Sequence, residues 1–320
     1  MDVPVGQAGM GGGLAGPPLA LAVATAGGLG TLGLVDPGVL ADWIRQFRDG
    51  APDRAVAVNF LMPFVRRRHV EVCVEARIDV AVLAFGGDHA LVDQLKDAGV
   101  FVFAMVGTDA QVRRAVHWGV DGLIAQGGEA GGHLTGETPA LQFLPHALEL
   151  ADGRPVMLAG GIATAGDVKA ALAAGAHAVI AGTRFLLTHE SGAHREYQRR
   201  ILAADKTYRT TLFGFGWPAP HRVIANGATE RWLHSDGRAK VAPRIINAPS
   251  PFAVRLLPMR SGGSLVRWQS PNLPVFSPVA PMVGMPDAWV DRAALYCGES
   301  GLRMASVTSA GQAVAELAGA

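Results

Sequence analysis

The sequence predicts an α/β protein, a (β/α)8 barrel of the TIM type with a C-terminal lid-like appendage. In the first 190 residues, short apolar runs alternate with longer runs of helical periodicity. Glycines follow the last two of eight predicted strands, where such barrels bind phosphate groups. Of the 320 residues, 49% are hydrophobic, only 17% are charged and 41 are glycine, which suits a large core of parallel strands and helices.

The predicted strands are short apolar segments rich in β-branched residues. In chain order they are Val3–Gln7, Leu29–Leu34, Ala55–Phe60, Val80–Phe85, Val100–Val106, Gly122–Gln126, Val156–Ala159 and Ala178–Ala181. An open doubly wound sheet is the competing architecture. The number of strands and the glycines after the last two favour the closed barrel.

Helical segments follow most of these strands. They are Pro18–Ala26, Pro37–Arg48, Arg66–Ala76, His89–Ala98, Asp109–Trp118, Ala140–Ala151 and Thr164–Ala174, and an eighth is expected to start near His189. Asp36 before Pro37 is typical of an N-cap followed by a first-turn proline. Gly99, Gly119 and Gly175 each come just before a strand and are expected to end a helix in the left-handed conformation.

The composition and periodicity of the sequence change near Ser191. Tyr208–Trp217 is aromatic and contains glycine, and Ala242–Pro286 is rich in proline. We therefore predict three parts: a barrel over residues 1–190, a lid-like extension on the substrate side over 191–303, and a return to the barrel over 304–320. The last part contains the helical stretch Ala310–Leu317.

Composition excludes several classes of protein. A formal net charge of +1 argues against binding to nucleic acid or to an anionic membrane. Two distant cysteines, Cys73 and Cys297, are expected to be free thiols in a cytoplasmic protein. The uncharged stretch Leu14–Val35 is long enough to cross a membrane, but its prolines and glycines divide it into a short helix and a short strand.

Two motifs are rejected on their context. Gly28-Leu29-Gly30-Thr31-Leu32-Gly33 has the spacing of a dinucleotide fingerprint, but it follows a helix and contains a strand, the reverse of the required order. We expect a turn with close packing instead. The histidines of His189–His194 are five residues apart, whereas a zinc helix needs a spacing of four. No metal site is predicted.

The segment Pro155–Phe185 predicts a phosphate site. Its sequence, PVMLAGGIATAGDVKAALAAGAHAVIAGTRF, places Gly160-Gly161 after the seventh predicted strand and Ala181-Gly182-Thr183 at the end of the eighth. Backbone N–H groups and helix N-termini at these points can bind a phosphate. Arg184 could add positive charge there or form a salt bridge elsewhere.

A glycine-rich loop follows the sixth predicted strand. It runs from Gln126 to Gly136, and its glycines allow a ligand to approach the backbone closely. Gln126 can both donate and accept hydrogen bonds, which suits the pyrimidine edge of a flavin. His133 lies on this polar loop, where it can act as a general base or donate to an anionic substrate. Glu129 is a second ionisable group, and we expect it to be solvated.

These segments resemble the nitronate monooxygenase family, once called 2-nitropropane dioxygenases. The similarity rests on GVDGLIAQGGEAGGHLTGE and PVMLAGGIATAGDVKAALAAGAHAVIAGTRFLLTHES, and it extends to AGGLGTLG, VNF and GWPAPHRV. The wider superfamily includes FMN-dependent enoyl-acyl-carrier-protein reductases and NADH:quinone reductases.

The resemblance implies a barrel that binds FMN without a metal. It implies that His133 is the catalytic histidine, which deprotonates a nitroalkane or orients its nitronate. It also implies cofactor contacts from a set of residues along the barrel: Met10, Asn59, Gln126, Gly131, Gly160, Gly161, Ala181, Gly182 and Thr183. The implied reaction is the oxidation of a nitronate by O2 to a carbonyl compound and nitrite.

The sequence departs from the family in three places. Ala8-Gly9-Met10 lacks the usual proline before the methionine, the turn from His133 to Gly136 is one residue longer, and the region between Asn59 and Gln126 is short. These differences affect the substrate more than the cofactor. Two other hypotheses therefore remain: an FMN-dependent NAD(P)H reductase of quinones or enoyl thioesters, and a non-catalytic flavin-binding protein. A homodimer is compatible with the sequence, which does not settle the oligomeric state.

Overall fold

Eight parallel strands form a barrel in the computed structural model, which describes residues 1–250, 267 and 269–319. The strands are β1 (Val5–Gln7), β2 (Thr31–Leu32), β3 (Ala57–Leu61), β4 (Val80–Ala84), β5 (Phe101–Val106), β6 (Gly122–Gln126), β8 (Val156–Ala159) and β9 (Ala178–Ala181). Their order is β1-β9-β8-β6-β5-β4-β3-β2. Each overlaps a strand predicted from the sequence.

The barrel closes between its first two strands. Gly6 and Leu29 form a parallel bridge beside β1 and β2. The Gln7 N–H donates to the Leu29 carbonyl at 2.9 Å, and the Leu29 N–H donates to the Val5 carbonyl at 3.0 Å. The (β/α)8 barrel predicted in preference to an open sheet is therefore confirmed.

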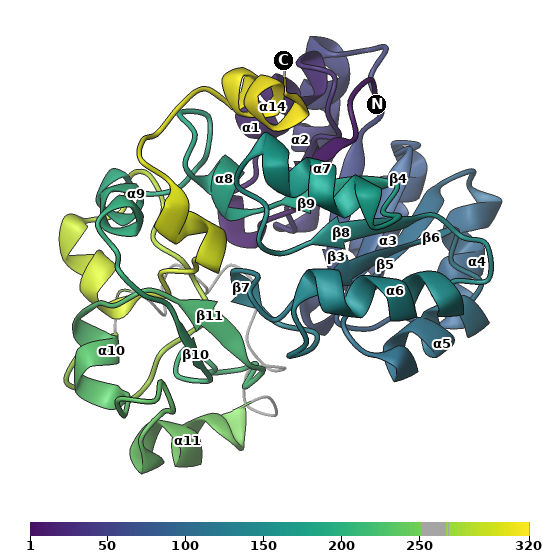
Figure 1. Ribbon diagram of the computed structural model, residues 1–320. Helices are drawn as coiled ribbons and strands as arrows, with labels where there is room; N and C mark the ends of the chain where they lie inside the picture. The colour runs from purple at the N-terminus through teal and green to yellow at the C-terminus, as the bar shows by residue number, and fades with distance from the viewer. Residues whose placement is uncertain (251–266, 268, 320) are drawn as a thin grey trace.

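Helices surround the barrel as the sequence predicts (Figure 1). They are α1 (Pro17–Thr25), α2 (Pro37–Gly50), α3 (Arg67–Glu75), α4 (His89–Asp97), α5 (Asp109–His117), α6 (Ala140–Leu150) and α7 (Ala165–Ala173). Asp36 caps α2 by accepting from the Gly38 N–H at 3.1 Å, as predicted. Gly99, Gly119 and Gly175 have φ of +80°, +81° and +100°, so the three glycine C-caps are also confirmed.

The prediction of a helix starting near His189 is wrong. The chain after β9 makes the short helix α8 (Thr183–Leu186), and α9 (Arg195–Leu202) begins only after His194. Between them the chain makes turns and two isolated bridges, Thr188 with Thr308 and Ala193 with Met282, and the His189 N–H donates to the Thr308 carbonyl at 2.9 Å. His194 caps α9, and its Nδ1 accepts from the Glu196 N–H at 3.2 Å.

The last helix fills the eighth position in the ring. Helix α14 (Ala310–Ala318) packs against α1, α7 and α8, and Figure 1 shows it beside α1 near both termini. Its buried residues, Ala310, Ala313, Val314 and Leu317, lie at helical spacing on one face. A segment distant in sequence thus completes the layer of helices around the barrel.

A second, antiparallel sheet lies over the carboxyl ends of the barrel strands. It contains β10 (Tyr208–Thr210), β11 (His221–Val223) and β7 (Gly132–His133), a two-residue strand that the sequence did not predict. The same region contains α10 (Gly227–Trp232), α11 (Val241–Asn247) and the 3-10 helices Asp287–Arg292 and Glu299–Arg303. Part of the predicted proline-rich stretch, residues 251–266, lies outside the described residues.

Glycines of the first predicted motif allow close packing. A Cβ on Gly30 would lie 2.1 Å from the Ala20 carbonyl oxygen, and one on Gly33 would lie 2.0 Å from the Met10 carbonyl oxygen. The expected tight helix–strand turn is therefore present at Gly28–Gly33, with β2 inside the motif.

Both cysteines are buried and free, and burial raises the pKa of each thiol to about 12. Within the described part of the chain, no helix is long and apolar enough to cross a membrane.

Candidate active site

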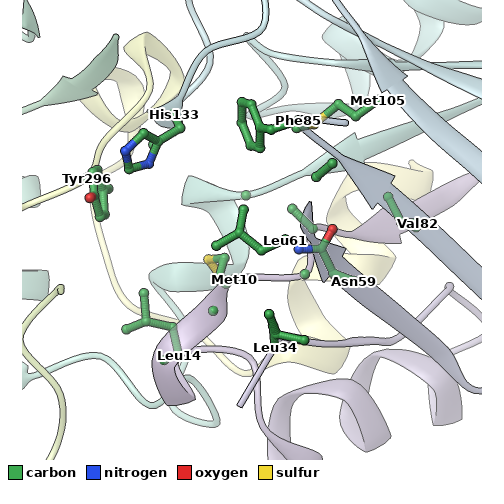
Figure 2. A pocket seen from close by; sticks show the side chains of 18 of the residues that line it. Met10, Leu14, Leu34, Asn59, Leu61, Val82, Phe85, Met105, His133 and Tyr296 are labelled. Atoms are coloured by element: carbon green, nitrogen blue, oxygen red, sulfur yellow. The ribbon is translucent and has the colours of Figure 1, made fainter. Parts of the chain in front are cut away.

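A cavity of about 800 Å³ opens at the carboxyl ends of the barrel strands. It is lined by every residue that the sequence singled out as a site residue: Met10, Asn59, Gln126, Gly131, His133, Gly160, Gly161, Ala181, Gly182 and Thr183. Segments far apart in the chain therefore meet at one place. Figure 2 shows several of these side chains around the cavity.

The floor of the cavity is apolar. It consists of side chains that point into the barrel from successive strands: Val82, Phe103, Ile124, Met157 and Ile180. These residues are nearly inaccessible to solvent and pack against one another. A flat, apolar ring system could lie on this layer while polar groups at the rim hold its edges.

Two turns after β8 and β9 provide backbone N–H groups to the cavity. Gly160 and Gly161 have φ of +112° and +72°, so a residue with a side chain would be strained at either position. Among the described residues, no acceptor is found for the backbone N–H of Gly161, Gly182 or Thr183. Free N–H groups at the ends of parallel strands suit an anion such as a phosphate.

Side chains next to these turns hold the protein itself together. The Thr183 hydroxyl accepts from the Gly298 N–H at 2.9 Å. Arg184 is buried, forms an ion pair with Glu316 and donates to the Thr308 hydroxyl at 3.2 Å. Arg184 therefore joins α8 to α14, and of the two roles considered for it the salt bridge is the one observed.

Asn59 brings an amide to the cavity from the middle of β3. Its side chain is buried, and no hydrogen bond joins its amide to any other described residue. A Cβ on Gly9 would lie 2.2 Å from the Asn59 Cβ, so the loop that carries Met10 must pass close to this side chain. In Figure 2, Met10 and Leu61 lie between Asn59 and His133.

Gln126 holds the glycine-rich loop in place. Its amide oxygen accepts from the Thr135 N–H and from the Thr135 hydroxyl, both at 2.8 Å. Its amide nitrogen donates to the His133 carbonyl at 3.1 Å, which leaves one N–H for a ligand. Gln126 thus positions the loop as well as lining the cavity, a role that spacing in the sequence could not reveal.

Gly131 is close to the protein backbone. A Cβ there would lie 2.5 Å from the Gly298 nitrogen. Glu129, expected to be solvated, instead accepts from the Ala140 N–H at the start of α6, at 3.0 and 3.1 Å. The glycines of this loop therefore allow it to pack between the barrel and the segment around Gly298.

His133 lies in β7 and is surrounded by rings. Its imidazole stacks on the Trp217 indole, with centroids 3.6 Å apart and planes 13° apart. His221, its cross-strand partner, and Tyr296 have ring centroids 5.0 and 5.5 Å away. Within the described chain, the Nε2 atom of His133 is buried and has no hydrogen-bond partner.

Burial keeps both histidines neutral. The pKa of His133 lies well below its usual value because the ring is removed from water and because His221 is adjacent. Burial lowers the pKa of His221 to about 4. The Phe213 N–H donates to His221 Nε2 at 3.2 Å, so His221 Nδ1 carries the proton and donates to the Ala219 carbonyl at 3.0 Å.

Sequence reasoning missed the aromatic residues that surround His133. Trp217 and His221 both fall in the segment Gly216–Val223, which had contributed only to the family resemblance. Phe85 has φ of +65°, an unusual conformation for a residue other than glycine, and its ring centroid is 4.8 Å from that of Trp217. The signal for Trp217 was available in sequence as an aromatic residue between glycine and proline.

Comparison with known proteins points to one family. The family model described as nitronate monooxygenase matches residues 34–319. A Bacillus subtilis protein named as a probable nitronate monooxygenase is 28% identical over 280 residues, which cover 73% of this chain and 78% of that protein.

Other relatives carry different names. A Mycobacterium tuberculosis protein, (3aS,4S,5R,7aS)-5-hydroxy-7a-methyl-1-oxo-octahydro-1H-indene-4-carboxyl-CoA dehydrogenase, is 36% identical over 75% of this chain and 68% of its own length. The chain spans 65% of the length of the protein of the same name from Rhodococcus jostii.

Solved structures share the whole fold. FabK from Thermotoga maritima has a TM-score of 0.78 at 26% identity, covering 99% of this chain and 92% of that chain. Nitroalkane oxidase from Streptomyces ansochromogenes has a TM-score of 0.76 at 27% identity, covering 99% and 95%. These similarities extend through the barrel and the region above it.

Proposed function

The chain belongs to the nitronate monooxygenase family of flavin oxidoreductases, and from this premise we propose that it oxidises nitronates with O2 to a carbonyl compound and nitrite. The observation that carries the proposal is the position of His133. This neutral imidazole borders the same cavity as the apolar floor and the free N–H groups of the glycine turns.

The residues of the cavity fit flavin mononucleotide. The N–H groups of Gly161, Gly182 and Thr183 have no protein acceptor among the described residues and would hold the phosphate. The apolar floor would support the flat ring, while the Asn59 amide and the remaining N–H of Gln126 would bind its polar edge. When bound, this group would supply the redox chemistry between a nitronate and O2.

His133 has two possible roles toward a substrate bound in this cavity. As a neutral imidazole, it can accept the α-proton of a nitroalkane or donate an N–H to a nitronate oxygen. An anionic nitronate next to the ring would favour the protonated form and raise the pKa of His133. Stacking on Trp217 fixes the plane of the imidazole, which limits the directions from which a substrate can hydrogen-bond to it.

The test compares two histidine variants loaded with flavin mononucleotide. His133→Asn should retain the flavin but release nitrite about 10²-fold or more slowly with an alkyl nitronate, because proton transfer or orientation is lost. His146→Asn, on the exposed side of α6, should match the unmodified protein. Equal nitrite release by the His133 variant would remove this residue from the mechanism, and no nitrite from any nitronate would refute the function.

A second candidate is reduction of a quinone or an enoyl thioester by NAD(P)H on the same scaffold. It is favoured by the 36% identical relative, whose name describes a carboxyl-CoA dehydrogenase, and by the size of the cavity. Anaerobic mixing with NADH should then bleach the bound flavin rapidly. Slow bleaching together with rapid nitrite release would exclude this alternative.

A further inference from the structure

The wall of the cavity around His133 is aromatic. Trp217 stacks on His133, and the Phe85 ring meets both rings edge to face, with centroids 6.1 Å from His133 and 4.8 Å from Trp217. Phe64 also packs edge to face on the Trp217 indole, with centroids 5.6 Å apart. Trp217 therefore contacts each of the other three rings, and its loss would open this wall.

Charged side chains are scarce around the cavity. Among the lining residues that the structure describes, only Asp36 and Arg66 carry a charge. Asp36 caps α2 and Arg66 immediately precedes α3, so both lie at helix starts. The rings next to His133 provide no counter-charge for a second anionic group of a substrate.

Hydrogen-bonding capacity on this wall is largely used by the protein. His221 is engaged through both ring nitrogens, and the Tyr296 hydroxyl donates to the Pro278 carbonyl at 3.0 Å. His133 has no hydrogen-bond partner for Nε2 within the described chain. Among the described residues, the wall therefore offers a substrate two polar groups without a partner, Nε2 of His133 and the adjacent indole N–H of Trp217, in otherwise apolar surface.

We infer that the cavity selects substrates with a single polar or anionic head and an otherwise apolar body, and that Trp217 is the specificity-determining residue. The head meets His133, and the apolar body packs against Trp217, Phe85 and Phe64. This inference rests on the proposed function and names its substrates: alkyl and aryl nitronates, in preference to nitronates that carry a second carboxylate.

The physical reason is the unequal cost of burial. Each methylene group that leaves water for an apolar wall strengthens binding by about four-fold. A second carboxylate would lose its hydration without gaining a partner on this wall, which weakens binding. The Kd should therefore fall as the apolar chain of a ligand becomes longer, and it should rise when the far end of that chain carries a charge.

The binding experiment uses the flavin-loaded protein and unreactive carboxylates that imitate the nitronate head. Titration calorimetry with butanoate, pentanoate and hexanoate should give a Kd that falls by about two- to four-fold for each methylene. Adipate, which has the length of hexanoate and a second carboxylate, should bind at least about ten-fold more weakly than hexanoate. Equal Kd values for the three chain lengths, or tighter binding of adipate, would overturn the inference.

Matched tryptophan variants assign the effect to Trp217. Trp217→Ala should reduce the dependence of Kd on chain length, whereas Trp289→Ala, which removes a half-buried tryptophan outside the cavity, should preserve it. The same dependence in both variants would show that Trp217 does not determine specificity. If adipate binds best and Arg66→Ala abolishes that preference, selection by charge replaces selection by the aromatic wall.

Turnover separates this inference from the proposed reaction. Butyl nitronate should be oxidised with a higher kcat/KM than propionate 3-nitronate, and Trp217→Ala should lower this ratio mainly through KM. If carboxylates bind as expected but no nitronate is oxidised, the reaction is wrong and the selection for apolar substrates stands. If propionate 3-nitronate is oxidised best, the reaction stands and the selection is refuted.

Discussion

His221 shows how the environment of one residue sets its chemistry. The ring is completely buried beside His133, and its two nitrogens bond to the backbone of Phe213 and Ala219. These bonds require the neutral ring, and burial lowers its pKa to about 4. His221 therefore stays uncharged at neutral pH and keeps the surroundings of His133 apolar.

The low pKa of His221 predicts a loss of stability in acid. Between pH 6.5 and about 4 the unfolded histidine binds a proton that the folded one does not, so the free energy of unfolding falls as the pH is lowered through this range. The full effect is about 3 kcal/mol for this residue. His69 and His133, whose pKa values are also lowered by burial, add to the slope.

Urea unfolding at several pH values measures that slope. His221→Asn should be less stable at pH 7, because it disturbs buried hydrogen bonds, but its stability should change less between pH 7 and pH 4.5. His234→Asn, at an exposed histidine, should retain the slope of the unmodified protein. If the free energy of unfolding depends on pH in the same way in the His221 variant and in the unmodified protein, His221 is not the source of the acid sensitivity.

At the scale of elements, α14 shows how a distant segment completes a repeating architecture. The Glu190 carboxylate accepts from the Ala310 N–H at 2.9 Å, and Ser309 caps the helix. The exposed Glu316 of α14 pairs with the buried Arg184 of α8. The ring of helices is thus held together by one buried guanidinium as well as by apolar packing.

Removal of Glu316 should therefore destabilise the barrel. Glu316→Ala leaves the Arg184 guanidinium buried without its carboxylate, which we expect to cost about 2 kcal/mol in the free energy of unfolding. Asp42→Ala breaks an exposed ion pair with Arg45 and should cost less than about 0.5 kcal/mol. Chemical denaturation of both variants measures their free energies of unfolding. Equal losses of stability in the two variants would mean that the ion pair with Glu316 does not stabilise the buried Arg184.

For the molecule as a whole, the cavity joins parts of the chain that have no local relation. Its lining runs from Gln7 near the start of the chain to Ser300 near its end, and it includes both the barrel strands and the sheet above them. A ligand that binds there contacts both regions in the folded protein only. Binding should therefore stabilise the whole molecule.

This coupling predicts a thermal shift that depends on the phosphate. Flavin mononucleotide at 100 times its Kd should add about 2.7 kcal/mol to the stability of the flavin-free protein. Riboflavin, which lacks the phosphate, should raise Tm less at the same concentration. Equal shifts for the two flavins would argue against a phosphate site.

Glycine variants locate the phosphate contact. Gly161→Ala should reduce the extra shift given by flavin mononucleotide, because a side chain at φ of +72° next to Glu129 would disturb the turn after β8. Gly119→Ala introduces similar backbone strain at φ of +81°, with open space around the added methyl group and away from the cavity. It should lower Tm but preserve the difference between the two flavins.

The sequence by itself determined the parts of the protein that depend on local order. The strands of the barrel, seven of its helices, the Asp36 cap and the three glycine C-caps follow from periodicity and from the backbone preferences of single residues. The glycine turns after β8 and β9 were predictable for the same reason. Parallel strands bring their carboxyl ends to one rim, so any group just after a strand belongs to that rim.

Tertiary structure alone decided the surroundings of His133 and the closure of the outer layer. Strand β7 has two residues and exists only because β11, far along the chain, pairs with it. Stacking of Trp217, the neutral state of His221 and the pairing of Arg184 with Glu316 likewise depend on contacts between distant segments. Such contacts leave no periodic trace in the sequence, since burial and pairing become defined only when the chain is folded.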